Sequence, residues 1–175
     1  PVILFVGRFV DGKRPQDVIA AFEKISETFS DVRLYFCGDG PLRNRLRRRI
    51  SKHGLDDRVR MLGQVDFAKM PSVYRSADIV VLPSLSEGFP RVILEALSSE
   101  TPVVASDLPQ VRKIVEQAGY TVTAGDIGDI ADAIGTLLTD PKQRRMYGAT
   151  GRQLLIEHGL TWESTVQRTT EKLQD

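Results

Sequence analysis

A chain of 175 residues with 41% hydrophobic and 27% charged residues has the composition of one folded globular domain, which excludes disordered and fibrous classes. No apolar run approaches the roughly 18 residues that a membrane-spanning helix needs. The single cysteine, Cys37, cannot form an internal disulfide. This cysteine usage, and a start that carries no basic signal-peptide region, predict a cytoplasmic protein.

The charge is nearly balanced, with 24 Lys and Arg against 23 Asp and Glu, which predicts no nucleic-acid partner. The balance hides one basic stretch that contains six cations and no acid. Its members are Arg43, Arg45, Arg47, Arg48, Arg49 and Lys52. The other 18 basic and 23 acidic residues carry a net charge of −5, so the surface is predicted to be polarised.

Short apolar runs alternate with longer segments of helical periodicity along the chain. The first helical segment has Val18, Phe22 and Ile25 on one face, and Pro15 suits its first turn. In chain order, the pattern predicts strand 2–6, helix 15–29, strand 32–37, helix 42–52, strand 58–62, helix 67–74, strand 78–82, helix 90–99, strand 102–105, helix 109–117, strand 120–122 and helices 127–139, 141–158 and 162–173.

This alternation predicts an α/β fold, a single Rossmann-like doubly wound parallel sheet of about six strands with helices on both faces. Strands that are apolar throughout support parallel pairing, because both of their faces are buried. The whole chain, 1–175, is predicted to be one domain with a helical tail over about 141–175. Ligands bind beyond the carboxyl ends of the strands in such sheets. The loops expected to share that edge are 7–14, 38–41, 63–66, 83–90 and 106–109.

The first of these loops, residues 7–14, reads GRFVDGKR and differs at one position from the phosphate-binding pattern G-x-x-x-x-G-K-[ST]. Arg14 replaces the hydroxyl residue that would hold Mg²⁺, and Pro15 removes a backbone N–H. The remaining glycines, with Arg8 and Lys13 above a helix N-terminus, suit a phosphate group without a metal. A tight turn with solvated charges is the alternative interpretation of this loop alone.

The loop after the fourth strand carries two glutamates, Glu87 before the predicted helix and Glu95 within it. Pro90 suits the start of that helix, and the backbone N–H groups around Gly88 point out of it. Carboxylates placed in this way can accept hydrogen bonds from sugar hydroxyls, as an acidic residue does in dinucleotide sites. The alternative is a helix-start carboxylate and a solvated glutamate.

Together these segments resemble the C-terminal, donor-binding domain of a family 4 (group 1) glycosyltransferase with the GT-B fold. The similarity covers residues 1 to about 110, and Thr161-Trp162-Glu163 fits the family's pattern more loosely. The matching segments are VGR…K at 6–13, VRLYFCGDGPLRNRL at 32–46, DRVRMLGQV at 57–65, ADIVVLPSLSEGFPRVILEAL at 77–97 and TPVVASDLP at 101–109.

The resemblance implies a role for each matching residue. Arg8 and Lys13 would bind the donor diphosphate, Glu87 the transferred sugar, and Glu95 the ribose, with Gly63 to Val65 near the base. The donor-binding set is then Gly7, Arg8, Lys13, Gly63, Val65, Glu87, Gly88, Phe89, Pro90 and Glu95. Arg8, Lys13 and Glu87 are expected to take part in catalysis.

The same resemblance implies retaining, metal-independent transfer of a hexosyl group from a UDP- or GDP-sugar in glycan biosynthesis. No cofactor and no metal ligand are expected, since the sequence contains no D-x-D triplet. The acceptor would bind an N-terminal domain of the same protein, so this chain alone is expected to be inactive. Three positions depart from the family pattern and leave the sugar open. They are Glu100 for a small residue, Leu108-Pro109 for a paired-glycine turn, and Lys113 for an acid.

Two other functions stay open at this point. The first is a P-loop-like nucleotide-binding domain, in which Asp39 would be the candidate Mg²⁺ ligand. The second is a non-catalytic module whose basic helix, 42–52, meets an anionic surface such as the cytoplasmic face of a membrane. Against the second, Leu46 and Ile50 give the helix an apolar stripe that its own sheet needs, so a solvated face is the alternative.

Overall fold

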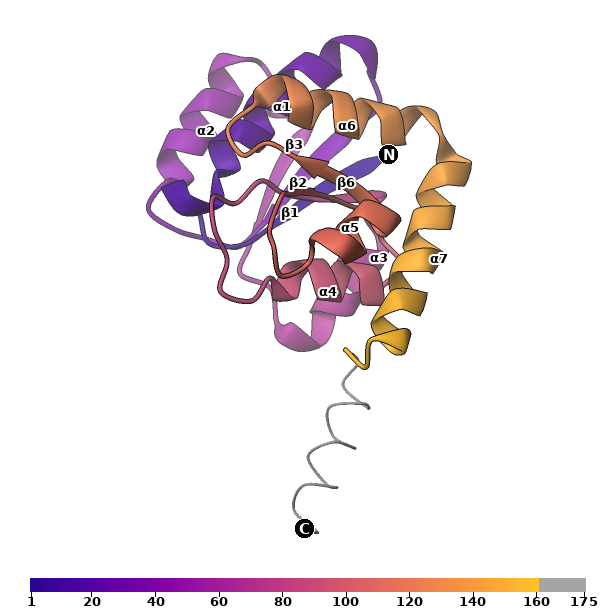
Figure 1. The fold of residues 1–175 in the computed structure, drawn as a ribbon. Helices are drawn as coiled ribbons and strands as arrows, with labels where there is room; N and C mark the ends of the chain where they lie inside the picture. Colours follow the sequence, from indigo (N-terminus) through magenta and orange to yellow (C-terminus); the bar gives the residue numbers. More distant parts are fainter. Residues whose placement is uncertain (161–175) are drawn as a thin grey trace.

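The computed structural model describes residues 1–160. They form one six-stranded sheet with helices packed on both of its faces (Figure 1). All neighbouring strands are parallel, and their order is β3-β2-β1-β4-β5-β6. The strands are β1 (Val2–Val6), β2 (Arg33–Cys37), β3 (Val59–Gly63), β4 (Ile79–Leu82), β5 (Val103–Ser106) and β6 (Gly119–Val122). The order reverses between β1 and β4, as in doubly wound Rossmann folds, and confirms the predicted fold class. The predicted helix over 162–173 lies outside the described residues.

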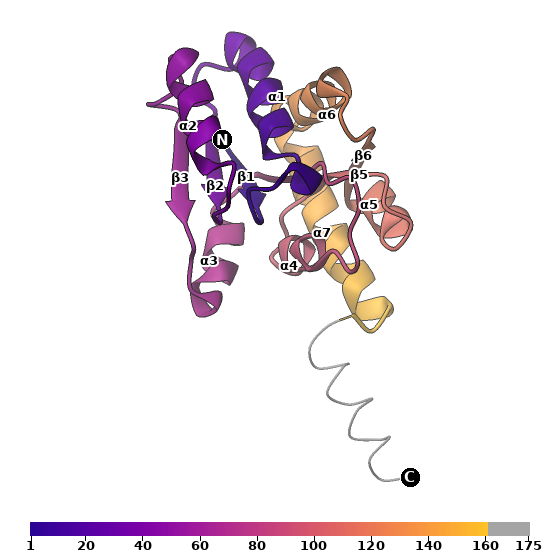
Figure 2. The same cartoon turned by 90° about the vertical axis from the view of Figure 1, so that its left-hand side faces the viewer.

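Helices α1, α2 and α6 cover one face of the sheet, and α3, α4 and α5 cover the other (Figures 1 and 2). The α-helices are α1 (Pro15–Thr28), α2 (Arg43–Lys52), α3 (Met70–Arg75), α4 (Arg91–Ser98), α5 (Arg112–Ala118), α6 (Ile127–Thr139) and α7 (Pro141–Glu157). Helix α7 packs against α4 and α5. Within residues 1–160, no helix is long and apolar enough to cross a membrane.

The alternation of side chains along each strand builds two hydrophobic cores, one on each face of the sheet. Ile3 and Phe5 of β1 face the core under α1, α2 and α6, which also receives Val81 of β4. Leu4 and Val80 belong to the core on the opposite face. All residues of β4 and β5 are buried, which is why these strands read as continuous apolar runs in the sequence.

Some helix boundaries differ from those predicted. Helix α4 begins at Arg91 because Pro90, with ψ of 68°, still lies outside the helical region. Helix α5 begins at Arg112 rather than 109, after a turn in which the Val111 N–H donates to the Leu108 carbonyl. The predicted helix over 67–74 divides into a 3₁₀ turn, η2 (Phe67–Lys69), and the short α3. Pro109 lies in this turn, and Leu108 and Val111 on either side of it are buried.

The turn between α4 and β5 holds Glu100, where the resemblance predicts a small residue. Glu100 adopts the left-handed region, with φ of 58°, which glycine reaches without cost. Its carboxylate accepts a hydrogen bond of 2.8 Å from Arg152 Nη1 on α7. Gly148, also on α7, passes so close that a Cβ there would lie 2.0 Å from the Glu100 carbonyl oxygen. The turn is therefore fastened to α7 by both backbone contact and an ion pair.

Candidate functional site

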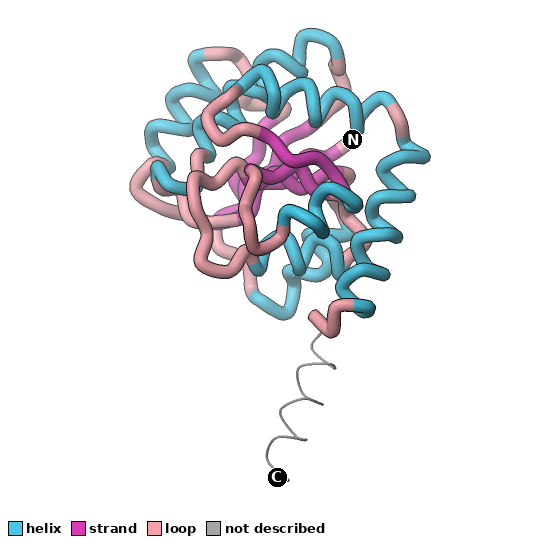
Figure 3. The backbone as a smooth tube through the Cα atoms, viewed as in Figure 1, coloured by secondary structure: helices cyan, strands magenta, loops and turns pink. Residues whose placement is uncertain are grey.

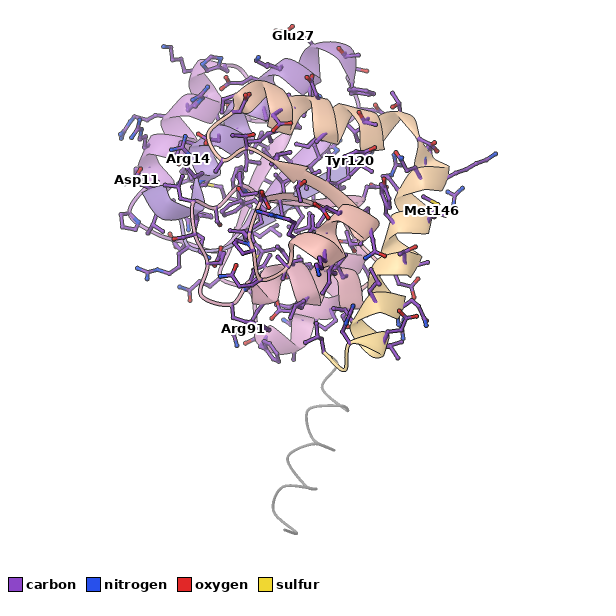
Figure 4. All side chains as sticks on the ribbon, in the orientation of Figure 1. Asp11, Arg14, Glu27, Arg91, Tyr120 and Met146 are labelled. Carbon is purple, nitrogen blue, oxygen red and sulfur yellow. The ribbon has the colours of Figure 1, made fainter. Side chains whose placement is uncertain are left out.

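The loops that follow the strands gather along one edge of the sheet, where Figure 3 shows them in pink. Because the sheet is fully parallel, this is the carboxyl edge for every strand. The predicted site residues of the first and fourth loops lie here, and Asp11 and Arg14 mark the first loop in Figure 4.

The loops after β1 and β2 cross in direct backbone contact. The Gly7 N–H donates to the Cys37 carbonyl at 3.0 Å, and the Phe9 N–H donates to the Asp39 carbonyl at 2.9 Å. Gly38 has φ of 131°, and a Cβ on it would lie 2.1 Å from the Gly7 carbonyl oxygen. Only glycine fits this crossing, so the predicted site residue Gly7 is held by backbone geometry.

Arg8 and Arg14, the two arginines of the first loop, have different surroundings. Arg8 is exposed, and its side chain forms no hydrogen bond or ion pair with any residue of the described part of the chain. Arg14 adopts the left-handed region, with φ of 54°, and pairs with Asp17, which is 5% exposed. Arg14 therefore has a structural role in the first turn of α1, and Arg8 remains available to a ligand.

The loop conformation differs from that of a P-loop. Residues Asp11–Lys13 form a 3₁₀ turn, η1, and the Gly12 carbonyl accepts the Leu85 N–H at 2.9 Å. The second glycine of the near-match is thus used to fasten this loop to the loop after β4. The P-loop alternative required these backbone groups to surround a phosphate.

Lys13 and Glu87 form an ion pair that joins the loop after β1 to the loop after β4. The Lys13 ammonium donates to both carboxylate oxygens of Glu87. The Glu87 side chain is only 9% exposed, whereas that of Lys13 is 26% exposed. The structure therefore brings together two of the three residues for which catalysis was predicted.

Gln110 supports the same loop and was not identified from the sequence. Its side-chain amide donates to the Glu87 carbonyl at 2.9 Å. Gln110 follows the predicted rim loop 106–109 by one residue, and that position was the only signal that could have found it. The Glu87 segment is consequently held by contacts from the loops after β1 and β5.

Glu95 lies on α4, and its carboxylate accepts a hydrogen bond from the Tyr74 hydroxyl at 2.8 Å. Tyr74 is 1% exposed, and its carbonyl accepts the Thr101 hydroxyl at 2.9 Å. Burial, and then the hydrogen bond to Glu95, raise the pKa of the Tyr74 hydroxyl far above its ordinary value of about 10. The phenol therefore stays protonated and donates to Glu95 at neutral pH. No sequence motif pointed to Tyr74.

The remaining predicted residues occupy different environments along the edge. Phe89 is 59% exposed, Pro90 is buried, and Gly88 has open space where a Cβ would project. Gly63 has φ of 74°, and its carbonyl accepts the Gly38 N–H at 2.8 Å. Val65 is half-buried and packs against the core between the sheet and α3.

A cavity of about 970 Å³ lies between α3, α4 and α7. It is lined by Tyr74, Glu95 and apolar side chains such as Leu94 and Leu155. Among the residues predicted to bind the sugar donor, Glu95 alone lines this cavity. The cavity and the loop site therefore share the Glu95 side chain. Among residues 1–160, no three His, Cys, Asp or Glu side chains are grouped so that they could hold a metal ion.

The six-stranded parallel sheet and the ion-paired loops at its carboxyl edge define a doubly wound α/β domain with a candidate ligand site at that edge. Residues 1–154 match the family described as glycosyl transferases group 1, and the chain belongs to this family. Because the match is to glycosyltransferases, the P-loop alternative loses its support.

Among curated relatives, the chain is similar to a phosphatidyl-myo-inositol mannosyltransferase from Mycobacterium leprae. The two are 37% identical over 155 residues, which cover 86% of this chain and 41% of the relative. The chain thus spans less than half the length of that relative.

Two solved structures share the fold. A sucrose-phosphate synthase from Thermosynechococcus elongatus superposes with a TM-score of 0.87 at 30% identity, covering 99% of this chain and 45% of that protein. The C-terminal domain of a group 1 glycosyl transferase from Francisella tularensis gives 0.83 at 29% identity, covering 89% of this chain and 84% of that domain. The second match confirms the resemblance to a C-terminal domain.

Proposed function

We propose that this chain is the donor-binding half of a retaining, metal-independent glycosyltransferase that uses a nucleoside-diphosphate sugar. The observation that carries the proposal is the Lys13–Glu87 ion pair at the carboxyl edge of the sheet. In the proposed site, the ion pair joins the cation expected to bind phosphate to the carboxylate expected to bind sugar hydroxyls. Family membership and the position of ligands in doubly wound folds support the same assignment.

Arg8 and Lys13 would bind the diphosphate in complementary ways. Arg8 has no partner within residues 1–160, so its full charge is available to a phosphate oxygen. Lys13 is held by Glu87 and is already positioned before a ligand arrives. A guanidinium can bind phosphate through two parallel hydrogen bonds, whereas an ammonium acts as a point charge.

During transfer, the bond between the sugar C1 and the diphosphate oxygen breaks, and an acceptor oxygen bonds to C1 on the same face. The nucleoside diphosphate leaves with the bonding electron pair, and the hydroxyl proton of the acceptor passes to an oxygen of the leaving diphosphate. Arg8 and Lys13 would stabilise the charge that develops on the leaving diphosphate. Fixed charges of this kind commonly supply a large share of catalysis because they need no reorganisation.

Glu87 and Glu95 would orient the donor through hydrogen bonds and would form no covalent bond to it. Lys13 binds the Glu87 carboxylate, Gln110 binds the Glu87 carbonyl, and the Leu85 N–H joins the same loop to Gly12. These contacts give the carboxylate a defined position for sugar hydroxyls. Glu95 is oriented by Tyr74 and would accept hydrogen bonds from the ribose. The acceptor would bind an N-terminal domain, and we expect the chain by itself to bind a donor without transferring the sugar.

Isothermal calorimetry with UDP, GDP and ATP, each in EDTA and in Mg²⁺, tests this proposal. We expect UDP or GDP to bind without metal. Arg8→Ala and Lys13→Ala should each weaken that binding about 10- to 150-fold, the value of one charged hydrogen bond of roughly 1.5–3 kcal/mol. Lys142→Ala, which removes an exposed cation at the start of α7, is the matched control and should bind as the parent does.

Two results would contradict the assignment. Parent-like affinity for UDP and GDP in both loop variants would remove Arg8 and Lys13 from the site. Binding of ATP that requires Mg²⁺, with no binding of UDP or GDP, would instead restore a P-loop-like function.

A further inference from the structure

Helix α2 carries six basic residues, and only some of them form ion pairs within the domain. Leu46 and Ile50 are buried in the core between α2 and the sheet. Arg43 pairs with Asp39 at 2.6 Å, and Arg49 forms two hydrogen bonds of 2.7 Å with Glu23 on α1. These four side chains account for the packing of the helix.

The remaining cations include Arg45, Arg48 and Lys52, which we call the basic row. Their spacing of three and then four residues places them on one face of the helix. All three are exposed, and none forms a hydrogen bond or ion pair with the part of the chain that the structure describes. Arg47, on another face, is also exposed. The basic row is therefore a line of uncompensated charge on the surface.

The start of α2, the helix that carries the basic row, is in backbone contact with the loop that carries Arg8. A Cβ on Gly40, two residues before the N-cap residue Leu42, would lie 2.7 Å from the backbone of Phe9. The Leu42 N–H donates to the Phe9 carbonyl at 3.0 Å. In Figures 1 and 2, α2 lies at the outer side of the molecule, close to the edge strand β3. The start of the helix that carries the basic row thus lies beside the donor edge.

We propose that the basic row docks this domain on an anionic lipid bilayer. A straight row on one helix can bring all three charges to a flat anionic surface at once. Each basic residue near such a bilayer contributes about 1 kcal/mol to the binding free energy, which is about five-fold in partitioning. The residues outside α2 carry a net charge of −5, so attraction is strongest at this helix and sets the orientation. Helix α2 contains no aromatic side chain that could stack on a base, which disfavours single-stranded nucleic acid.

Co-sedimentation of the 175-residue chain with vesicles tests the docking face. The vesicles contain phosphatidylcholine alone or phosphatidylcholine with phosphatidylglycerol. We expect the parent to sediment with the anionic vesicles only, and to be released at about 0.5 M salt, where exposed charges are screened. The triple variant Arg45→Gln, Arg48→Gln, Lys52→Gln should bind about 100-fold more weakly.

The matched control removes three exposed cations elsewhere, by Lys113→Gln, Lys142→Gln and Arg145→Gln, and should bind as the parent does. Equal losses in the two triple variants would mean that net charge, and not α2, attracts the bilayer. Parent-like binding of the α2 variant, or no preference of the parent for anionic vesicles, would overturn the proposal. So would salt-sensitive binding to DNA without binding to vesicles.

Discussion

At the scale of single residues, the two glutamates of the candidate site are positioned by contacts from neighbouring side chains. Lys13 and Gln110 fix the segment of Glu87, and Tyr74 fixes Glu95. Tyr74 and Gln110 come from segments that share no motif with the glutamates they contact. Their contribution is visible only once the chain is folded.

Tyr74→Phe tests this support for Glu95 through protein stability. The variant removes the hydrogen bond to a carboxylate, so the free energy of unfolding should fall by about 1.5–3 kcal/mol. Urea unfolding followed by circular dichroism at pH 7 measures the difference. Unchanged stability would mean that the 2.8 Å contact has no net value.

The pH dependence of the free energy of unfolding provides a second test of the role of Tyr74. Folding raises the pKa of Tyr74 above its unfolded value of about 10, so the folded state retains a proton that the unfolded state loses. The stability from this group is complete below pH 10 and is lost as the pH rises beyond it. The stability of Tyr74→Phe should therefore decline less steeply than that of the parent above pH 10.

At the scale of elements, the close approach of α7 to the turn before β5 is the tightest contact between a helix and a loop described above. It requires a glycine on α7, because the backbone of Glu100 lies where a side chain at Gly148 would begin. The helix pattern alone could not reveal this requirement. Sequence spacing predicts helix α7, but the neighbour it touches is 48 residues away.

Gly148→Ala should lower the free energy of unfolding by at least about 1–3 kcal/mol, since backbone atoms must shift to admit the methyl group. Gly135→Ala is the matched control, because Gly135 lies inside α6 with no atom within 4 Å of the added methyl. The control should instead gain about 0.5–1 kcal/mol from helix propensity. Thermal unfolding of both variants measures the contrast, and equal shifts would contradict the packing argument.

At the scale of the whole molecule, the strands are shared by the two cores, so we expect the cores to unfold together. Adjacent residues of β4 point to opposite faces: Val80 to the core under α3, α4 and α5, and Val81 to the core under α1, α2 and α6. Both are fully buried. A sheet shared in this way favours one cooperative unfolding transition.

Val80→Ala and Val81→Ala test this cooperativity as a matched pair. Each should cost roughly 2 kcal/mol and lower the midpoint of the same single transition. Far- and near-ultraviolet circular dichroism, recorded together during heating, should give coincident curves in both variants. Two separate midpoints, with each variant moving only one, would show that the faces unfold independently.

The sequence predicts much of this molecule because its strongest signals are local. Continuous apolar runs such as residues 79–82 identify buried parallel strands, and helical spacing identifies α1 and α6. The predicted helix starts, 90 and 109, precede the observed starts at Arg91 and Arg112, because Pro90 lies outside the helical region and a turn comes before α5. Glu87 and Lys13 were found in separate loops, but their pairing depends on how two loops meet across β1 and β4.

The pairing of Lys13 with Glu87 also affects how a charged ligand first meets this edge of the sheet. The two charges cancel at a distance, which leaves Arg8 as the uncompensated cation among the three residues expected to act on the donor. Of these three residues, therefore, only Arg8 adds net attraction for a diphosphate at long range. The affinity must come from contacts formed after arrival, so variants of this edge will differ mainly in how slowly they release the nucleotide.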